Sequence, residues 1–225
     1  MQKTTNKFKE AELDKFQETH MNLMIETTVH ELRKHRFDAH FFETRDSLLK
    51  FILDNSQDAV TAGVAGTHTV RALGIVTMLE EAGKTVYDHW KFKPGDPEEL
   101  ACRKKQLTCD LFVTSANAVT MTGEIVNKDG CGNRINAMTF GPRKVIIVVG
   151  RNKLVTDLDA ALTRIEEVAA PIRAISLNRK TPCVKTAQCM DCDSPERICN
   201  ITSIIHRRPM MTDLKVAIIA EDLGY

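Results

Sequence analysis

The chain has 225 residues, 43% hydrophobic and 27% charged, so it is long enough to bury the core of one large globular domain. Its formal net charge of +1 and its aromatic content of 5% argue against a strongly basic or base-stacking surface, and we expect no nucleic-acid partner. The N-terminus has no apolar signal-peptide region, and no apolar run reaches the roughly 20 residues that span a bilayer. We therefore expect a cytoplasmic protein with no membrane partner, whose thiols stay reduced.

Apolar residues recur at helical spacing between Leu13 and Leu32 and predict one long amphipathic helix over residues 8–36. Such a helix packs on the core of its own chain or covers another subunit, so a homo-oligomer is an open alternative. The next predicted elements, in chain order, are a strand over 38–44, a helix over 47–55 capped by Asp46, a strand within 58–63, a glycine turn, a helix over 67–81 capped by Thr67, and a strand over 84–89.

The second half of the chain continues this alternation. Its predicted elements are a helix over 96–108 with Pro97 in its first turn, a strand over 109–120, a hairpin over 121–134, a strand over 144–150, a helix over 156–175, and closing strands over 201–208 and 214–222. Alternating strands and helices predict a three-layer α/β fold with a mostly parallel sheet. We divide the chain into a helical extension, 1–36, and an α/β domain, 37–225.

Four of the seven cysteines lie in TPCVKTAQCMDCDSPERIC, within a cysteine segment that we place at 181–200. A CxxC pair brings two thiolates onto one ion or cluster, and four thiolates satisfy either tetrahedral zinc or a cubane iron–sulfur cluster. Structural zinc usually takes two short knuckles, whereas wide and unequal spacing suits a [4Fe–4S] cluster. Zinc, a redox pair and unliganded buried thiols are the alternatives. The predicted metal ligands are Cys183, Cys189, Cys192 and Cys199.

The loop GVAGTHT, residues 63–69, predicts an anion-binding site. A glycine turn before a helix points free backbone N–H groups outward, and the helix dipole adds positive potential that suits phosphate or carboxylate. Glycine is also usual in tight strand-to-helix turns that bind nothing. The predicted ligand-binding residues of this loop are Gly63, Gly66, Thr67 and Thr69.

A second polar region, residues 115–134, follows a predicted strand, where open α/β sheets bind ligands. Glu124 is a candidate catalytic base or nucleophile, and Arg134 is a candidate clamp for carboxylate or phosphate. Turn formation alone explains the Asp-Gly and Gly-Asn pairs of this region. Cys131 is either a reactive thiol or a small filler. The predicted ligand-binding residues here are Asn117, Thr120, Asn127, Asp129, Asn133 and Arg134.

Residues 114–155, TSANAVTMTGEIVNKDGCGNRINAMTFGPRKVIIVVGRNKLV, closely resemble the lactate-utilisation (LUD) domain family, and GVAGTHTV resembles its glycine turn. The tail over 181–209 resembles one branch of that family, small stand-alone proteins with these cysteines. The resemblance implies the NagB/RpiA/CoA-transferase-like fold, in which a glycine turn binds phosphate-bearing ligands and some CoA transferases use a glutamate nucleophile. Family members occur in operons that oxidise L-lactate to pyruvate beside iron–sulfur proteins, although lactate-linked members often lack the cysteine tail.

Three functions are compatible with these patterns. The first, which we favour, is an iron–sulfur protein that supports cytoplasmic oxidation of lactate or another small hydroxy acid, with a small anionic metabolite as ligand and an iron–sulfur or flavin protein as redox partner. The second is an enzyme or binding protein for a phosphorylated or CoA-linked metabolite, with a structural zinc or cysteine segment. The third is a non-catalytic assembly or regulatory subunit that uses its N-terminal helix as a partner surface.

Overall fold

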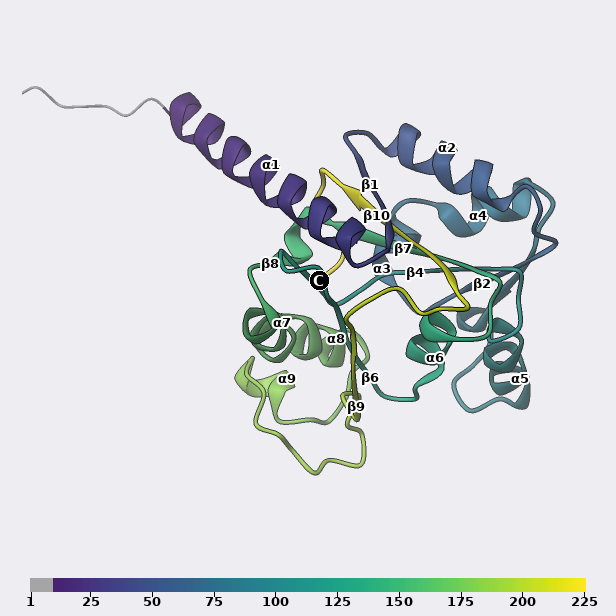
Figure 1. Ribbon diagram of the computed structural model, residues 1–225. Coiled ribbons are helices and arrows are strands. Elements are labelled where there is room, and N and C mark those ends of the chain that lie inside the picture. The colour runs from purple at the N-terminus through teal and green to yellow at the C-terminus, as the bar shows by residue number, and fades with distance from the viewer. Residues whose placement is uncertain (1–9) are drawn as a thin grey trace, which may run out of the picture.

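A computed structural model describes residues 10–225 and is built around a central parallel sheet covered by helices on both faces (Figure 1). Every neighbouring pair in the sheet is parallel, which confirms the predicted three-layer α/β fold. The strand order is β1 (Asp38–Phe42), β10 (Asp213–Ile219), β7 (Lys144–Gly150), β4 (Leu111–Thr114), β2 (Thr61–Val64) and β3 (Thr85–Asp88).

The central strand β7 shows why a continuous apolar run is needed here. Side chains alternate along a strand, so a strand that is covered on both faces must be apolar at every position. Val145, Ile147 and Val149 pack in the core beneath α1 (Glu10–Lys34) and α6 (Asn133–Thr139), whereas Ile146 and Val148 pack beneath α2 (Arg45–Ser56), α3 (His68–Ala72) and α4 (Ile75–Glu81). The sheet thus separates two cores.

A second, smaller sheet was not predicted. Its strands are β8 (Leu154–Val155), β5 (Ala118–Thr120), β6 (Ile125–Asp129) and β9 (Ile201–Ile205). The strand predicted over 109–120 divides into β4 and β5, which lie in different sheets. The predicted hairpin ends at β6, because residues 133–139 form α6. The strand predicted over 201–208 pairs antiparallel with β6 and does not join the main sheet. Helix α7 (Leu158–Arg164) covers the outer face of this small sheet.

The predicted N-terminal helix is confirmed as α1, and its expected start at residue 8 lies outside the described residues. Ile25, Val29 and Leu32 on its second half are buried in the main core. By contrast, Phe16 on its first half is 60% exposed, and Figure 1 shows this end projecting from the body of the protein. The division of the chain at residue 36 stays a prediction, and so does a homo-oligomer.

Two predicted long helices are interrupted. The helix predicted over 67–81 breaks into α3 and α4 because Gly74 adopts a left-handed conformation with φ of 68°. The helix predicted over 156–175 contains a π-helical turn, η3 (Ile165–Ala169), between α7 and α8 (Ala170–Ser176). The side chain of Thr44, not Asp46, caps α2. The remaining short or separate helices are η1 (His89–Lys91), α5 (Pro97–Gln106), η2 (Arg151–Lys153) and α9 (Cys183–Thr186).

Among the helices of residues 10–225, none combines the length and the apolar character that crossing a membrane requires.

Truncation of an apolar side chain should have a large effect on stability in the second half of α1 and almost none in the first half. Leu32→Ala removes a fully buried side chain and should lower the free energy of unfolding by about 2–5 kcal/mol. Phe16→Ala, on the exposed half, should change it by less than about 0.5 kcal/mol. Urea unfolding followed by circular dichroism measures both values. A large loss in Phe16→Ala would show that the first half of α1 is covered in solution.

Candidate functional site

A cavity of about 570 Å³ lies at the edge of the main sheet where the parallel strands end. Segments that follow five of these strands line it, and each contributes one or more polar side chains. Representatives, in the order of β2, β3, β4, β7 and β10, are Thr67, His89, Ser115, Lys153 and Tyr225. Open parallel sheets bind ligands at this edge, because the strand ends bring separate loops to one place.

The glycine turn contributes only part of the predicted anion site. Gly66, Thr67 and Thr69 line the cavity, whereas Gly63 does not. A Cβ atom on Gly63 would lie 2.9 Å from the Sγ atom of Cys109, so this glycine permits close packing inside the sheet. Helix α3 has only five residues, and Thr67 makes no side-chain cap bond. A short helix has a weak dipole, so the positive potential of the cavity must come from side chains.

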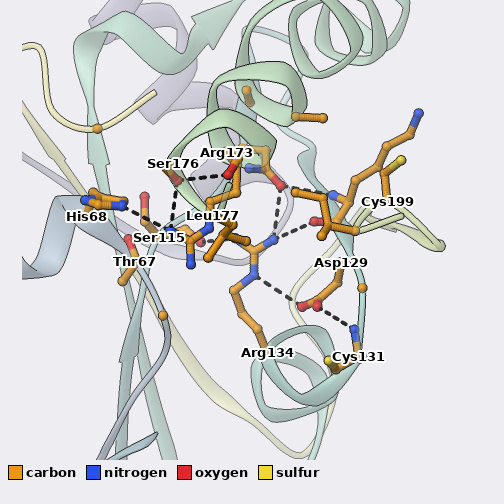
Figure 2. Close-up of a pocket in the computed structure, with 18 of the residues that line it drawn as sticks. Thr67, His68, Ser115, Asp129, Cys131, Arg134, Arg173, Ser176, Leu177 and Cys199 are labelled. Atoms are coloured by element: carbon orange, nitrogen blue, oxygen red, sulfur yellow. Dashed lines mark hydrogen bonds and ion pairs between the residues drawn. The ribbon is translucent and has the colours of Figure 1, made fainter. Parts of the chain in front are cut away.

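The guanidinium of Arg134 holds the polar loop together. It donates to the backbone oxygens of Lys128, at 2.8 Å, and Ser115, at 3.3 Å, and to Oδ1 of Asn117 at 3.1 Å. It also forms an ion pair with Asp129 at 3.4 Å (Figure 2). Four of its five N–H groups are therefore engaged, which leaves one for a ligand. We conclude that Arg134 mainly positions the loop and adds positive potential.

The other polar residues of this loop divide into two groups. Asn117, Asp129 and Asn133 line the cavity with Arg134, as the sequence predicts, but Thr120 and Asn127 do not. Asn127 is fully buried, and its Oδ1 atom accepts a hydrogen bond from the backbone N–H of Asn117 at 3.1 Å. Asn127 therefore supports Asn117 from behind the cavity wall.

The carboxylate of Glu124 points into a local turn instead of the cavity. It accepts hydrogen bonds from the hydroxyls of Thr120 and Thr122, and it is not among the cavity-lining residues. These hydrogen bonds offset the cost of partial burial and lower the pKa of Glu124, so it is ionised at neutral pH. This geometry gives no support to a catalytic role for Glu124, and the prediction remains without a structural basis.

Lys153 is one of the functional candidates that the sequence analysis did not identify. Its side chain is only 3% exposed, and its amine donates to Oγ1 of Thr69 at 2.8 Å and to Oγ of Ser115 at 3.0 Å. Both partners are neutral. Burial, followed by the charges of Arg164 and Arg134, lowers the pKa of Lys153 from 10.5 to about 7. A shift of this size corresponds to about 5 kcal/mol of destabilisation of the buried charge.

Positive side chains outnumber carboxylates around the cavity. Three of its cations are paired, Arg103 with Glu99, Lys128 with Glu166 and Arg134 with Asp129. Three more have no carboxylate within 4.0 Å among residues 10–225, and these are Lys153, Arg173 and Arg179. An excess of positive charge on buried and half-buried side chains is costly without a counter-ion, so the cavity is suited to an anionic ligand.

Two arginines contact the ring of Trp90 in the cavity wall, and one of them, Arg173, lines the cavity itself. The guanidinium of Arg71 lies 3.9 Å from the ring centroid of Trp90, and that of Arg173 lies 5.1 Å from the same centroid. Arg173 also donates to Nε2 of His68 at 3.1 Å. Burial and the charge of Arg173 lower the pKa of His68, so this histidine is a neutral acceptor here. Trp90 is 37% exposed, which leaves part of its ring available to a ligand.

All four cysteines of the predicted metal site lie around one small pocket of about 20 Å³, together with Thr181, Met190 and Arg197. Cys199 lines both this pocket and the large cavity. Arg197 donates to the backbone oxygen of Cys192 at 2.7 Å and braces the segment. Burial raises the pKa of Cys199, while the nearby charge of Arg197 acts in the opposite direction. The four cysteines thus line one small pocket that shares Cys199 with the larger cavity, and metal binding by them stays a prediction.

The four thiols are not arranged as a preformed site for one metal ion. Within the described residues, no three histidine, cysteine, aspartate or glutamate side chains are close enough to hold one metal ion. Zinc requires every sulfur at about 2.3 Å from one centre, whereas the thiolates of a [4Fe–4S] cluster bind separate iron atoms and lie farther apart. A pocket of about 20 Å³ holds little more than a water molecule, so the segment would have to open before it could hold a cluster.

Several of the missed residues carried a signal in the sequence. Lys153 follows a continuous apolar strand by three residues, and Trp90 follows the strand that ends at Asp88. The rule that pointed to Asn117, a polar residue just beyond a strand, applies equally to them. Arg173 carried no such signal, because it reaches the cavity from the middle of α8.

Comparison with known proteins agrees with the fold. The family model of the LUD domain matches residues 25–219. A crystal structure of a DUF162 family protein from Deinococcus radiodurans, at 1.70 Å resolution, superposes with a TM-score of 0.50 and 12% sequence identity, over 90% of this chain and 98% of that one. No protein with a curated description matches the sequence.

The buried charge of Lys153 predicts that the protein becomes more stable between pH 7 and pH 9. The pKa is about 7 in the folded state and 10.5 in the unfolded chain, so over this interval the unfolded chain keeps a proton that the folded chain releases. The penalty is fully present below pH 7 and is relieved as the pH rises, by about 2 kcal/mol at pH 9.

Urea unfolding at both pH values measures this gain. Lys153→Met should abolish it, and Lys50→Met on the exposed surface of α2 should retain it. An equal gain in wild type and Lys153→Met would show that Lys153 is charged when the protein is folded at pH 9.

Proposed function

The chain belongs to the LUD domain family, and we propose that it binds lactate or another small hydroxy acid in the basic cavity beside a [4Fe–4S] cluster. In this proposal the cluster is held by Cys183, Cys189, Cys192 and Cys199. The protein would support oxidation of the acid in the cytoplasm. An iron–sulfur or flavin protein would be the redox partner.

The observation that carries the anion part of the proposal is the buried amine of Lys153. It lies within the cavity, and no carboxylate of the described chain neutralises it. An incoming carboxylate would supply the missing countercharge and raise the pKa of Lys153 back toward its usual value. Arg173, which contacts only neutral groups through His68, Ser176 and Tyr225, supplies a second positive charge for the same ligand.

The position of Cys199 supports the cluster part of the proposal. Because this cysteine and its neighbour Ile198 line both pockets, a cluster on the four thiolates would form part of the wall of the ligand cavity. When bound, an iron–sulfur cluster supplies one-electron transfer. Asn200 connects the segment to the polar loop, since its N–H donates to the backbone oxygen of Asp129 at 3.1 Å. A backbone hydrogen bond therefore links the cysteine segment to a loop that lines the ligand cavity.

The size of the cavity favours a second candidate, a phosphorylated or CoA-linked metabolite. A volume of about 570 Å³ lies in the range of pockets that enclose drug-sized ligands and exceeds what lactate fills. The exposed part of Trp90 offers an aromatic face for a larger group. In this alternative the cysteine segment is structural and holds zinc or no metal.

Ligand titrations followed by tryptophan fluorescence separate these two candidates, because Trp90 is the single tryptophan of the chain and lines the cavity. The first candidate predicts that L-lactate binds and that Lys153→Met weakens its affinity at least about tenfold, which is about 1.4 kcal/mol. Lys50→Met removes the same charge from the exposed surface of α2 and should leave the affinity unchanged. Binding of coenzyme A without binding of L-lactate would favour the second candidate.

The cluster has a direct chemical assay. Anaerobically purified protein should contain about four iron and four sulfide per chain and show broad visible absorbance. Cys189→Ser should lower both contents, whereas Cys131→Ser, which alters an exposed cysteine outside the four-cysteine pocket, should leave them unchanged. About one zinc per chain without sulfide would contradict the iron–sulfur assignment.

A further inference from the structure

Lys153 has the surroundings of a nucleophile in addition to those of an anion-binding cation. Its amine is fixed by two hydrogen bonds, to the hydroxyls of Thr69 and Ser115, and it lies in the wall of the cavity. A lysine that only neutralises an anion binds it more tightly when its amine is charged. A carboxylate of the protein beside the amine would keep it charged. Lys153 instead lies near the guanidinium groups of Arg134 and Arg164, which disfavour its protonated form. Desolvation next to another cation is the usual way in which proteins make a lysine amine nucleophilic.

Three other candidate nucleophiles lack this combination of position and activation. The hydroxyl of Ser115 donates to the backbone oxygen of Ala116 at 3.3 Å, so its proton is directed away from the amine of Lys153. Glu124 lies outside the cavity wall. Lys128 lines the cavity, but its amine is paired with the carboxylate of Glu166 at 2.7 Å. Lys153 is therefore the amine that is both placed and activated to attack a ligand.

We propose that Lys153 forms a covalent imine with the carbonyl carbon of a 2-oxo acid bound in this cavity. This proposal rests on the proposed function and specifies the class of ligand. The amine lone pair forms a C–N bond to the carbonyl carbon. The C–O bond then breaks, and the oxygen leaves as water with the two amine protons, so the step needs no oxidant or reductant. The imine takes up one proton from solvent, which restores the positive charge at this position. The arginine side chains of the cavity hold the carboxylate of the acid.

The chemical class of ligand follows from these groups. The acid needs a carboxylate for the cations and an adjacent ketone for the amine, and a 2-oxo acid carries both. It is also the product class of hydroxy-acid oxidation, so the same cavity would distinguish the reduced acid, which binds reversibly, from the oxidised acid, which becomes covalently attached. An imine withdraws electrons from the neighbouring carbon, so the attached acid would be prepared for proton transfer or bond formation at that carbon.

Trapping with pyruvate and sodium cyanoborohydride tests the proposal, because the reagent reduces an imine to a stable secondary amine. Intact-protein mass should show one adduct per chain at pH 7.5, and peptide mapping of the wild-type protein should place it on Lys153. Lys153→Arg keeps the charge but cannot form the adduct and should fall to background. Lys50→Arg alters an exposed lysine of α2 outside the cavity and should be trapped like wild type. Circular dichroism establishes that each variant is folded.

L-lactate separates failure of this inference from failure of the proposed function, because it has a carboxylate but no ketone. If L-lactate binds to the wild-type protein and pyruvate is not trapped on Lys153, the imine is wrong and the anion site stands. Equal trapping in Lys153→Arg would also overturn the imine. If L-lactate does not bind and pyruvate is not trapped, both the imine and the hydroxy-acid proposal are wrong.

Discussion

A buried ammonium group without a countercharge is the constraint around which the candidate site is organised. Removing a lysine charge from water costs several kcal/mol, and a protein normally offsets that cost with a carboxylate. Lys153 receives only the hydroxyls of Thr69 and Ser115 from the described chain, and two arginines increase the cost. The fold retains this unfavourable group because the apolar cores on both faces of the sheet are large. A local loss of folding stability of this kind is expected at sites where a bound ligand supplies the missing countercharge.

The parallel sheet brings together groups that are far apart in the chain. Thr69, Ser115 and Lys153 follow three different strands, and the carboxyl ends of those strands meet at one edge. The small second sheet then connects this edge to the cysteine segment, because β9 begins two residues after Cys199 and pairs with β6. A ligand in the cavity and a metal group on the cysteines would consequently lie against the same loop. That arrangement gives a physical reason for the two features to occur in one small protein.

Much of the fold could be predicted from the sequence, because periodicity and turn residues report local structure. The run KVIIVVG identified the central strand, and Pro97 identified the start of a helix. Sheet membership could not be predicted, since nothing local distinguishes β4 from β5 or shows that β9 pairs with β6. The break at Gly74 was visible only as a glycine inside a helical pattern, which helices often tolerate.

The candidate site was predicted less completely than the fold. Residue type and position after a strand pointed to Asn117, Asp129, Asn133 and Arg134, all of which line the cavity. The same reasoning pointed to Glu124, which does not line the cavity, because sequence does not show which way a turn directs its side chain. It also passed over Lys153, whose importance comes from burial and from neighbours more than 30 residues away. Whether these residues bind a ligand stays a prediction.

The most direct test of the central claim is the number of protons taken up when the cavity binds its anion. Calorimetric titration of L-lactate at pH 8, in two buffers with different ionisation enthalpies, measures this number. Free Lys153 is largely neutral at that pH, so the account predicts uptake of close to one proton on binding, and no uptake in Lys153→Met. Binding without proton uptake, or equal uptake in the variant, would contradict the account, and so would the absence of binding.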